Sequence, residues 1–297
     1  MKELGYLIKR NTKLFFKDKG MFFTSLITPA ILLVLYATFL AGIYKDSFIS
    51  SIPEGITLPE KLIDGCVGGQ LFASLLAVSC ITVSFCSNFL MVKDKVTVAR
   101  ADLTMAPVKK STMALSYYIS TVLSTLIVCV VAIGACFIYL GIKGWYLSVL
   151  DVALILLDVF LLVMFGTALS SIINYFLSSQ GQISAVGSIV SAGYGFICGA
   201  YMPISQFGEG LQAVLSFLPG TYGTALLKNH ALRGVFAEMS DLGVPEAAVQ
   251  GMKEGIDCSF TCLGAEVTIP MMYAVLIGSV VLLVSVYILI NKCIKRK

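Results

Sequence analysis

Residues 66–113 read CVGGQLFASLLAVSCITVSFCSNFLMV, followed at once by KDKVTVARADLTMAPVKKSTM. The first part, 66–92, has no charged side chain and exceeds the roughly 20 apolar residues that a helix needs to cross a hydrocarbon core about 30 Å thick. The second part, 93–113, carries five basic and two acidic residues. An uncharged run of this length joined to a short basic connection predicts a membrane-spanning helix whose second end faces the cytoplasm.

Five further apolar stretches have similar length, so that the predicted spans are 21–44, 66–92, 114–141, 146–172, 182–202 and 270–291. The segments on one side of these spans hold 15 of the 21 basic residues: Lys2, Lys9, Arg10, Lys13, Lys17, Lys19, Lys93, Lys95, Arg100, Lys109, Lys110, Lys292, Lys295, Arg296 and Lys297. The other side holds six basic residues and 11 of the 17 acidic ones. Because basic residues concentrate in cytoplasmic segments, we predict cytoplasmic termini, an external 203–269 segment and a place in the plasma membrane.

The composition fits an all-α integral membrane protein with one transmembrane domain over 1–297. Hydrophobic residues make up 58% of the chain, charged residues 13%, and the mean hydropathy is +0.91. The net charge of +4 is then the sum of a basic inner and an acidic outer face, and it gives no sign of nucleic-acid binding.

The chain before the first span has apolar residues at helical spacing, with lysines and Arg10 between them. This pattern, over about 1–20, predicts an amphipathic helix in the membrane interface, with its cations near anionic headgroups. A short soluble helix or a disordered tail is the alternative.

Polar groups within the spans are the first candidates for function. Asn88 and several hydroxyl residues make the second span suited to face protein or a cavity. In the fourth span, Asp151 lies near the outer end, within reach of headgroups or water, and Asp158 lies about 10 Å deeper. Asp158 is either a functional ionisable group in an aqueous path or a hydrogen-bonded structural residue, and no basic residue in any predicted span offers itself as its partner.

The fifth span ends with Ser191, Gly195 and Gly199 at four-residue spacing, a pattern that lets two helices approach closely and predicts a dimer contact. After Pro203 the chain is moderately apolar but broken by glycine and proline, which predicts a re-entrant segment over about 203–227. The acidic stretch 229–269 then reads as an external cap, with His230 expected as a solvated surface residue. Cys258 and Cys262, the two cysteines in this aqueous segment, are either bridged or free thiols.

The order of these features resembles the ABC-2 family of ABC-transporter permeases. The sequences that carry the resemblance are ADLTMAPVKK (101–110) and GAYMPISQFGEGLQAVLSFLPGTYGTALLKNHALRG (199–234). The resemblance covers essentially the whole chain, through loose patterns of proline, glycine and aromatic residues.

The resemblance implies the membrane half of an exporter. Two such permeases, alike or different, form the translocation path between them, and each contacts a cytoplasmic ATPase that binds ATP and Mg. It further implies an elbow helix at Met1–Lys19, a coupling helix at about Lys93–Lys110 and re-entrant helices at about Pro203–Leu227. The residues expected to couple to the ATPase are Lys93, Lys95, Arg100, Asp102 and Lys109; those expected near the path are Asn88, Asp158, Tyr194 and Phe196.

No P-loop sequence G-x-x-x-x-G-K-[ST] occurs in the chain, so we expect no nucleotide site, cofactor or metal of its own. An ion-coupled secondary transporter using Asp158, an intramembrane enzyme and a non-transporting scaffold or sensor are the rival classes. Carriers commonly show internal repeats, which the two halves of this chain lack, and an enzyme needs several convergent acids, histidines or a nucleophile. The sequence does not identify the substrate, although the lack of a basic cluster in any span argues against a strongly anionic one.

Overall fold

The computed structural model describes residues 2–50, 58–97, 99, 103, 105, 108–262 and 265–293. Nearly all of them are helical. The helices are α1 (Lys2–Lys17), α2 (Lys19–Leu35), the π-helical turn η1 (Tyr36–Leu40), α3 (Ala41–Ser50), α4 (Glu60–Val96), α6 (Lys110–Lys143), α7 (Val149–Phe176), α8 (Gln180–Ile197), the 3₁₀ turn η2 (Ile204–Gln206), α9 (Glu209–Leu215), α10 (Pro219–Asp241), α11 (Glu246–Gly255) and α12 (Ile269–Cys293). The strands β1 (Thr261–Cys262) and β2 (Ala265–Glu266) pair antiparallel.

Five helical segments among the described residues are long and apolar enough to cross a membrane: Lys19–Leu40, Glu60–Val96, Lys110–Lys143, Val149–Phe176 and Ile269–Lys292. They correspond to five of the six predicted spans and confirm an all-α membrane protein. The remaining predicted span, 182–202, corresponds to α8, which has 18 residues and ends at Ile197. Two glutamines and four glycines make α8 less apolar than the others, so six spans remain a proposal.

Helix α4 is the centre of the bundle. It contacts α2, α3, α6, α7, α8 and α10, and nearly every residue from Leu62 to Asp94 is buried. Small residues allow this close approach: a Cβ on Gly69 would lie 2.6 Å from the side chain of Leu232 in α10. The equivalent atom on Gly166 of α7 would lie 2.7 Å from Ile81. Packing between backbones, which membrane helices depend on, therefore fixes α4 on several sides.

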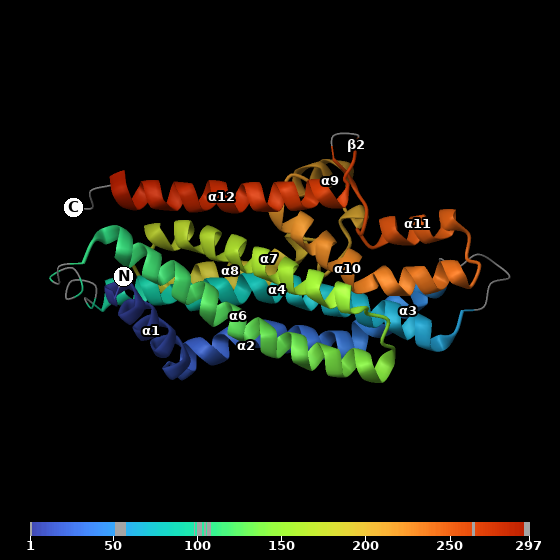
Figure 1. Cartoon of the computed structure of the whole chain (residues 1–297), viewed down its shortest axis with the longest axis horizontal. Coiled ribbons are helices and arrows are strands. Elements are labelled where there is room, and N and C mark those ends of the chain that lie inside the picture. Colours follow the sequence, from blue (N-terminus) through green and yellow to red (C-terminus); the bar gives the residue numbers. More distant parts are fainter. Residues whose placement is uncertain are drawn as a thin grey trace.

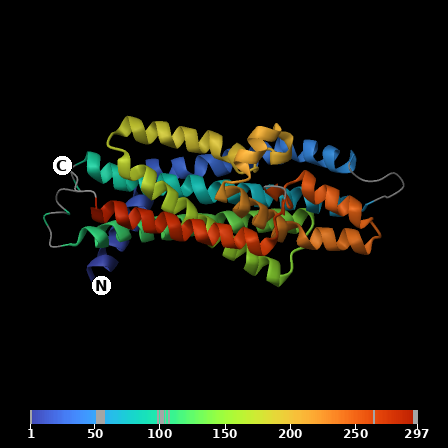
Figure 2. The same ribbon diagram turned by 90° about the horizontal axis from the view of Figure 1, so that it is seen from above.

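Both ends of the bundle are visible in Figure 1. The N-terminus of α1, the C-terminal end of α12 and the junction of α7 with α8 lie at one end, whereas α3 and α11 lie at the other. The view from above in Figure 2 shows the same arrangement, with α8 and α12 on different sides of the bundle. The described helix ends that border the predicted cytoplasmic segments, at α1, α7, α8 and α12, therefore share one end of the molecule.

Helix α1 is present as the N-terminal pattern predicts, and its apolar side packs against the protein. Phe15 is buried beside Val83 of α4 and Val128 of α6. Asn11 is buried as well, and its amide donates to the hydroxyl of Ser116 at 3.4 Å. The expectation that the apolar face lies in lipid is thus wrong for Phe15, because α4 and α6 cover it.

The predicted boundary between a re-entrant segment ending at 227 and a cap beginning at 229 is also wrong. Helix α10 runs without interruption through that point and packs against α4, α7 and α12. Glycines at its start allow the contact, since a Cβ on Gly223 would meet Leu162 of α7 at 2.3 Å. Helix α11 packs beside α10, since Val249 and Met252 share a hydrophobic cluster with Leu62 of α4 and Phe236 of α10.

Candidate functional site

A groove of ≈510 Å³ lies between α2 and α8, with α4 as its floor. Helix α8 lines it with residues spaced three to four apart, so that one face of the helix points into it. Helix α2 does the same through Thr24, Ile27 and Thr28. The lining residues are Asp18, Gly20, Met21, Thr24, Ile27, Thr28, Cys86, Phe89, Lys93, Gln180, Ile183, Ser184, Gly187, Ser188 and Ser191.

The groove is neutral and rich in hydroxyl groups. Thr24 and Thr28 face it from α2, and three serines face it from α8. Its two charged residues, Asp18 and Lys93, form an ion pair with each other. A surface of hydroxyls with apolar side chains between them can bind an uncharged or amphipathic molecule, or it can pack against another protein helix.

The end of α4 is tied to the N-terminal segment by two consecutive residues. Lys93 pairs with Asp18, whose carboxylate also accepts from the Met21 backbone N–H at 3.2 Å and caps α2. Asp94 is buried and accepts from Arg10 at 2.8 Å and from the Tyr117 hydroxyl at 2.6 Å. Helices α1, α4 and α6 are thus joined at the point where the 93–113 connection begins.

Electrostatics around this end of α4 favours the charged forms of Asp18 and Arg10. The hydrogen bond from Lys93 lowers the pKa of Asp18, and the hydrogen bond to Asp94 raises the pKa of Arg10. Both ion pairs therefore persist at neutral pH. Lys95, the next basic residue, donates to the backbone carbonyls of Asn174, Tyr175 and Leu177 at 2.9, 2.8 and 3.2 Å, so that it caps the end of α7.

A second buried carboxylate lies within α7. Asp158 of α7 accepts from the Tyr273 hydroxyl of α12 at 2.7 Å, and its other oxygen lies 2.6 Å from His230 Nδ1 of α10. Asp158 is fully buried and His230 is only 4% exposed. The expectation that His230 is a solvated surface residue is therefore wrong, and Asp158 has a partner that comes from outside the predicted spans.

Asp151, expected to reach headgroups or water, is also buried. It forms a capping box with Ser148 at the start of α7 and lies 2.7 Å from Arg233 Nε of α10. The two carboxylates of the fourth predicted span are thus both used to hold α10 against α7.

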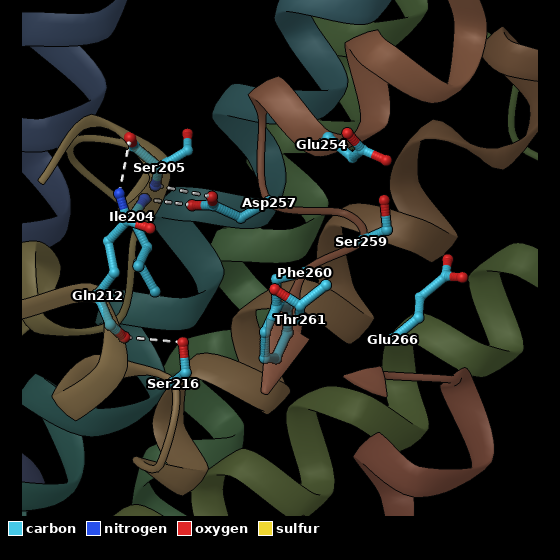
Figure 3. Close-up of a pocket in the computed structure, with 10 residues that line it drawn as sticks. All are labelled: Ile204, Ser205, Gln212, Ser216, Glu254, Asp257, Ser259, Phe260, Thr261 and Glu266. Atoms are coloured by element: carbon cyan, nitrogen blue, oxygen red, sulfur yellow. Dashed lines mark hydrogen bonds between the residues drawn. The ribbon is translucent and has the colours of Figure 1, made fainter. Parts of the chain in front are cut away.

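Lys228 and Asp257 connect the ends of α8 and α11 with α10. The Lys228 ammonium is fully buried and donates to the carbonyls of Gly199 and Ile256, both at 2.8 Å. Asp257 lies 3.6 Å from this ammonium and accepts from the Ile204 N–H at 2.6 Å. Figure 3 shows Asp257 pointing toward Ile204 and Ser205 at one side of a ≈290 Å³ pocket, with Glu254 and Glu266 on the other side.

Cys258 and Cys262 are free thiols in the structure. Cys258 is buried, and burial raises the pKa of its thiol to about 12. The thiolate that would attack a disulfide is therefore scarce at neutral pH.

The residues expected near a path lie in different environments. The Asn88 amide donates to the hydroxyls of Ser170 and Ser171, each at 2.9 Å, inside the bundle. Asn88 and Asp158 are thus enclosed between helices of one chain and do not line the groove. Tyr194 is buried against Gly220, whereas Phe196 is 49% exposed and packs edge-on against Tyr201.

The residues expected to contact an ATPase are only partly described. Lys93 and Lys95 have the intramolecular partners given above, and Lys109 is exposed at the start of α6. Arg100 and Asp102 lie outside the described residues.

The four-residue spacing predicts one continuous helical face formed by Ser191, Gly195 and Gly199. The structure does not have this face. Helix α8 ends at Ile197, and Gly199 has a left-handed backbone with φ +71°. Gly195 is covered by the chain's own Tyr201, since a Cβ there would lie 2.3 Å from the ring. Ser191 alone lines the groove.

Sequence reasoning missed the groove hydroxyls and Lys228. The spacing of Thr24 with Thr28 and of Ser184 with Ser188 is a helical signal that could have found the first set. No local pattern reveals that Lys228 is buried, because its partners belong to other segments.

The sequence matches the ABC-2 type transporter family model over residues 2–229. The match includes α1 to α9 and the first half of α10, and therefore all three helices that line the groove. Comparison with curated proteins gives no match.

Proposed function

The chain belongs to the ABC-2 type transporter family, and on that basis we propose that it is the permease subunit of an ATP-driven ABC exporter. The family match over residues 2–229 carries the proposal. We propose that six helices cross the plasma membrane and that α8 is the fifth of them. ATP and Mg bind to a separate cytoplasmic ATPase chain, whose hydrolysis drives the change between inward-open and outward-open states.

The path is proposed to form between two permease chains, alike or different, along the groove of α2, α4 and α8. Two observations support this. The groove is open along one side of the single chain, and the interior of the bundle is already filled by α4. A second permease placed against α2 and α8 would close the groove into a path.

Coupling to the ATPase is proposed to pass through the 93–113 connection. Lys93 and Asp94, at its start, are bonded to Asp18 and Arg10, so that movement of the connection reaches α1 and α2 directly. Replacing Arg100 or Asp102 by Ala should lower substrate-stimulated ATP hydrolysis. Stimulation and ATPase copurification that match the unsubstituted chain in both variants would exclude this connection as the contact.

The orientation is proposed from the distribution of basic residues: both termini and 93–113 inside, 203–269 outside. In a background without native cysteines, Glu246→Cys should react with an impermeant thiol reagent added to intact cells. Lys109→Cys should react only after lysis. Both positions are exposed, so the reverse result would contradict the orientation.

The ion-coupled alternative receives less support. Both oxygens of Asp158 are within hydrogen-bond distance of residues of the same bundle, which fits a structural carboxylate. Transport that continues after ATP depletion and follows an ion gradient would favour the alternative.

A direct test uses the chain with its copurified ATPase in proteoliposomes. Ser188→Trp places a large side chain in the groove and should abolish ATP-dependent export. Ile189→Trp is the matched control, because the neighbouring side chain is 70% exposed and does not line the groove. Export by Ser188→Trp at the rate of the control, or purification without any P-loop ATPase, would contradict the proposal.

A further inference from the structure

One face of α1 carries a row of lysines. Lys2, Lys9, Lys13 and Lys17 are all exposed, and at about 100° per residue they fall within a narrow sector of the helix. Tyr6 lies in the same sector and is 73% exposed. We call these four lysines the α1 lysine stripe.

The charge of the α1 lysine stripe is not compensated within the part of the chain that the structure describes. None of the four lysines has an ion-pair partner there. Two acids close to α1 on other segments are already paired, Asp94 with Arg10 and Asp18 with Lys93. The single acid of α1 is Glu3.

Contacts between α1 and the bundle fix the direction in which the stripe points, and two of them, at Phe15 and Asn11, lie on the side of α1 opposite to the stripe. Phe15 is buried between α4 and α6, Asn11 donates to Ser116, and Arg10 pairs with Asp94. Rotation of α1 about its axis would break all three contacts. The stripe therefore faces away from the bundle. In Figure 1, α1 lies obliquely across the end of the bundle at which the N-terminus is found.

Aromatic residues place this helix at the level of the membrane surface. Phe16 is 36% exposed and Phe23, one turn into α2, is 61% exposed. Exposed phenylalanines are typical of the apolar side of interfacial helices, and tyrosines such as Tyr6, which is 73% exposed, gather where hydrocarbon meets headgroups. Because α2 begins at Lys19, two residues after α1 ends, the lysines of α1 lie at headgroup depth.

We propose that the α1 lysine stripe is a binding surface for anionic phospholipid headgroups of the phosphatidylglycerol type. Phosphate groups complement four ammonium groups that have no ion-pair partner among the described residues, and a membrane surface brings phosphates within reach at high local concentration. The proposal does not depend on the transport function, since it needs only the folded chain in a bilayer.

The test measures lipid binding to the full chain by native mass spectrometry, with phosphatidylglycerol and phosphatidylcholine as probes. The chain should bind phosphatidylglycerol in preference. In the triple variant Lys9→Ala/Lys13→Ala/Lys17→Ala, affinity for the tightest-bound phosphatidylglycerol should fall by about a hundredfold, since each surface lysine contributes about fivefold.

Two control variants separate this surface from general charge effects. Lys9→Arg/Lys13→Arg/Lys17→Arg should retain the preference, because the charges remain. Lys61→Ala/Lys143→Ala/Lys253→Ala, which removes three charges in the outer half, should also retain it. The single variant Lys13→Ala, expected to lose about fivefold, serves if the triple variant does not fold.

Equal binding of the two lipids by the unsubstituted chain would overturn the proposal. So would undiminished phosphatidylglycerol binding by the alanine triple, or an equal loss in the outer triple. If the alanine triple keeps its lipids but loses the ATPase on copurification, the stripe is a protein contact and the proposal is wrong.

Discussion

Asp94 near the end of α4 and Asp158 within α7 are held by the same kinds of group. Each carboxylate accepts from one tyrosine hydroxyl and lies beside one basic side chain, and each joins three helices. The difference is in the basic partner. Arg10 carries a permanent charge and its side chain is 30% exposed, whereas His230 is a weak base with a side chain only 5% exposed.

The same set of groups, a carboxylate with a tyrosine hydroxyl and a basic side chain, thus occurs in a partly exposed and in a fully buried environment. At the membrane surface a guanidinium can stay hydrated while it binds a carboxylate, so the contact can break and re-form as helices move. In the interior the pair lies in a medium of low dielectric constant, where breaking it leaves groups that no water can reach. We therefore expect the Asp158 cluster to hold the fold and the Asp94 cluster to tolerate movement.

The largest effect is expected for Asp158→Ala. It removes the partner of His230 and Tyr273 inside the bundle and should lower the free energy of unfolding by about 3–5 kcal/mol. Denaturation of the purified chain in detergent would measure this, with Asp158→Asn as the variant that keeps shape and hydrogen-bonding capacity. A loss below about 1 kcal/mol would show that the interior cluster is not needed for the fold.

Asp94→Ala should cost less, about 2 kcal/mol, because Arg10 can turn toward water when its partner is gone. Measured in the same detergent, its loss should be smaller than that of Asp158→Ala. If Asp94→Ala proves the more damaging of the two, the proposed contrast between a wet and a dry cluster is wrong.

The tyrosines sharpen the comparison. Tyr273→Phe and Tyr117→Phe each remove the hydroxyl bonded to the carboxylate, and each should cost about 1 kcal/mol, since hydrogen bonds between membrane helices are modest. Urea or SDS titration of both variants would give the two values. Tyr139→Phe, which changes a tyrosine outside both clusters, is the control and should leave stability unchanged.

Salt should produce the smallest effect. About 1 M NaCl shortens the Debye length to about 3 Å and should reduce the coupling of Arg10 with Asp94 by a few tenths of a kcal/mol. A double-mutant cycle at two salt concentrations would measure it. The coupling of His230 with Asp158 should not change, because ions do not enter the bundle; an equal salt effect on both pairs would show that water reaches the interior cluster.

Much of the architecture could be predicted from the sequence because the relevant requirement is local. A span needs only a long apolar run, so five of the predicted spans appear as long apolar helices. The remaining predicted span, 182–202, is less distinct because α8 has glutamines, serines and glycines at many of its positions. The serines of α8 line the groove, so the same polar residues lower the hydropathy of this helix and form the candidate site.

The individual site residues were predicted less well. The small-residue pattern at 191, 195 and 199 assumed an unbroken helix, but the chain turns back after Ile197 and Tyr201 covers Gly195. The acidic, interrupted stretch around His230 suggested a solvated cap. Instead, α10 continues into it and buries the imidazole against α7.

By itself the sequence determined that this is a multi-pass membrane protein of the ABC-2 type transporter family. It also determined that most basic residues fall in the segments on one side of the predicted spans. These properties depend on the order of apolar and charged residues along the chain, which a bilayer selects segment by segment. Only the tertiary structure decided which polar groups are paired. Asp158 and His230 are 72 residues apart, Arg10 and Asp94 are 84 apart, and such contacts arise when helices pack.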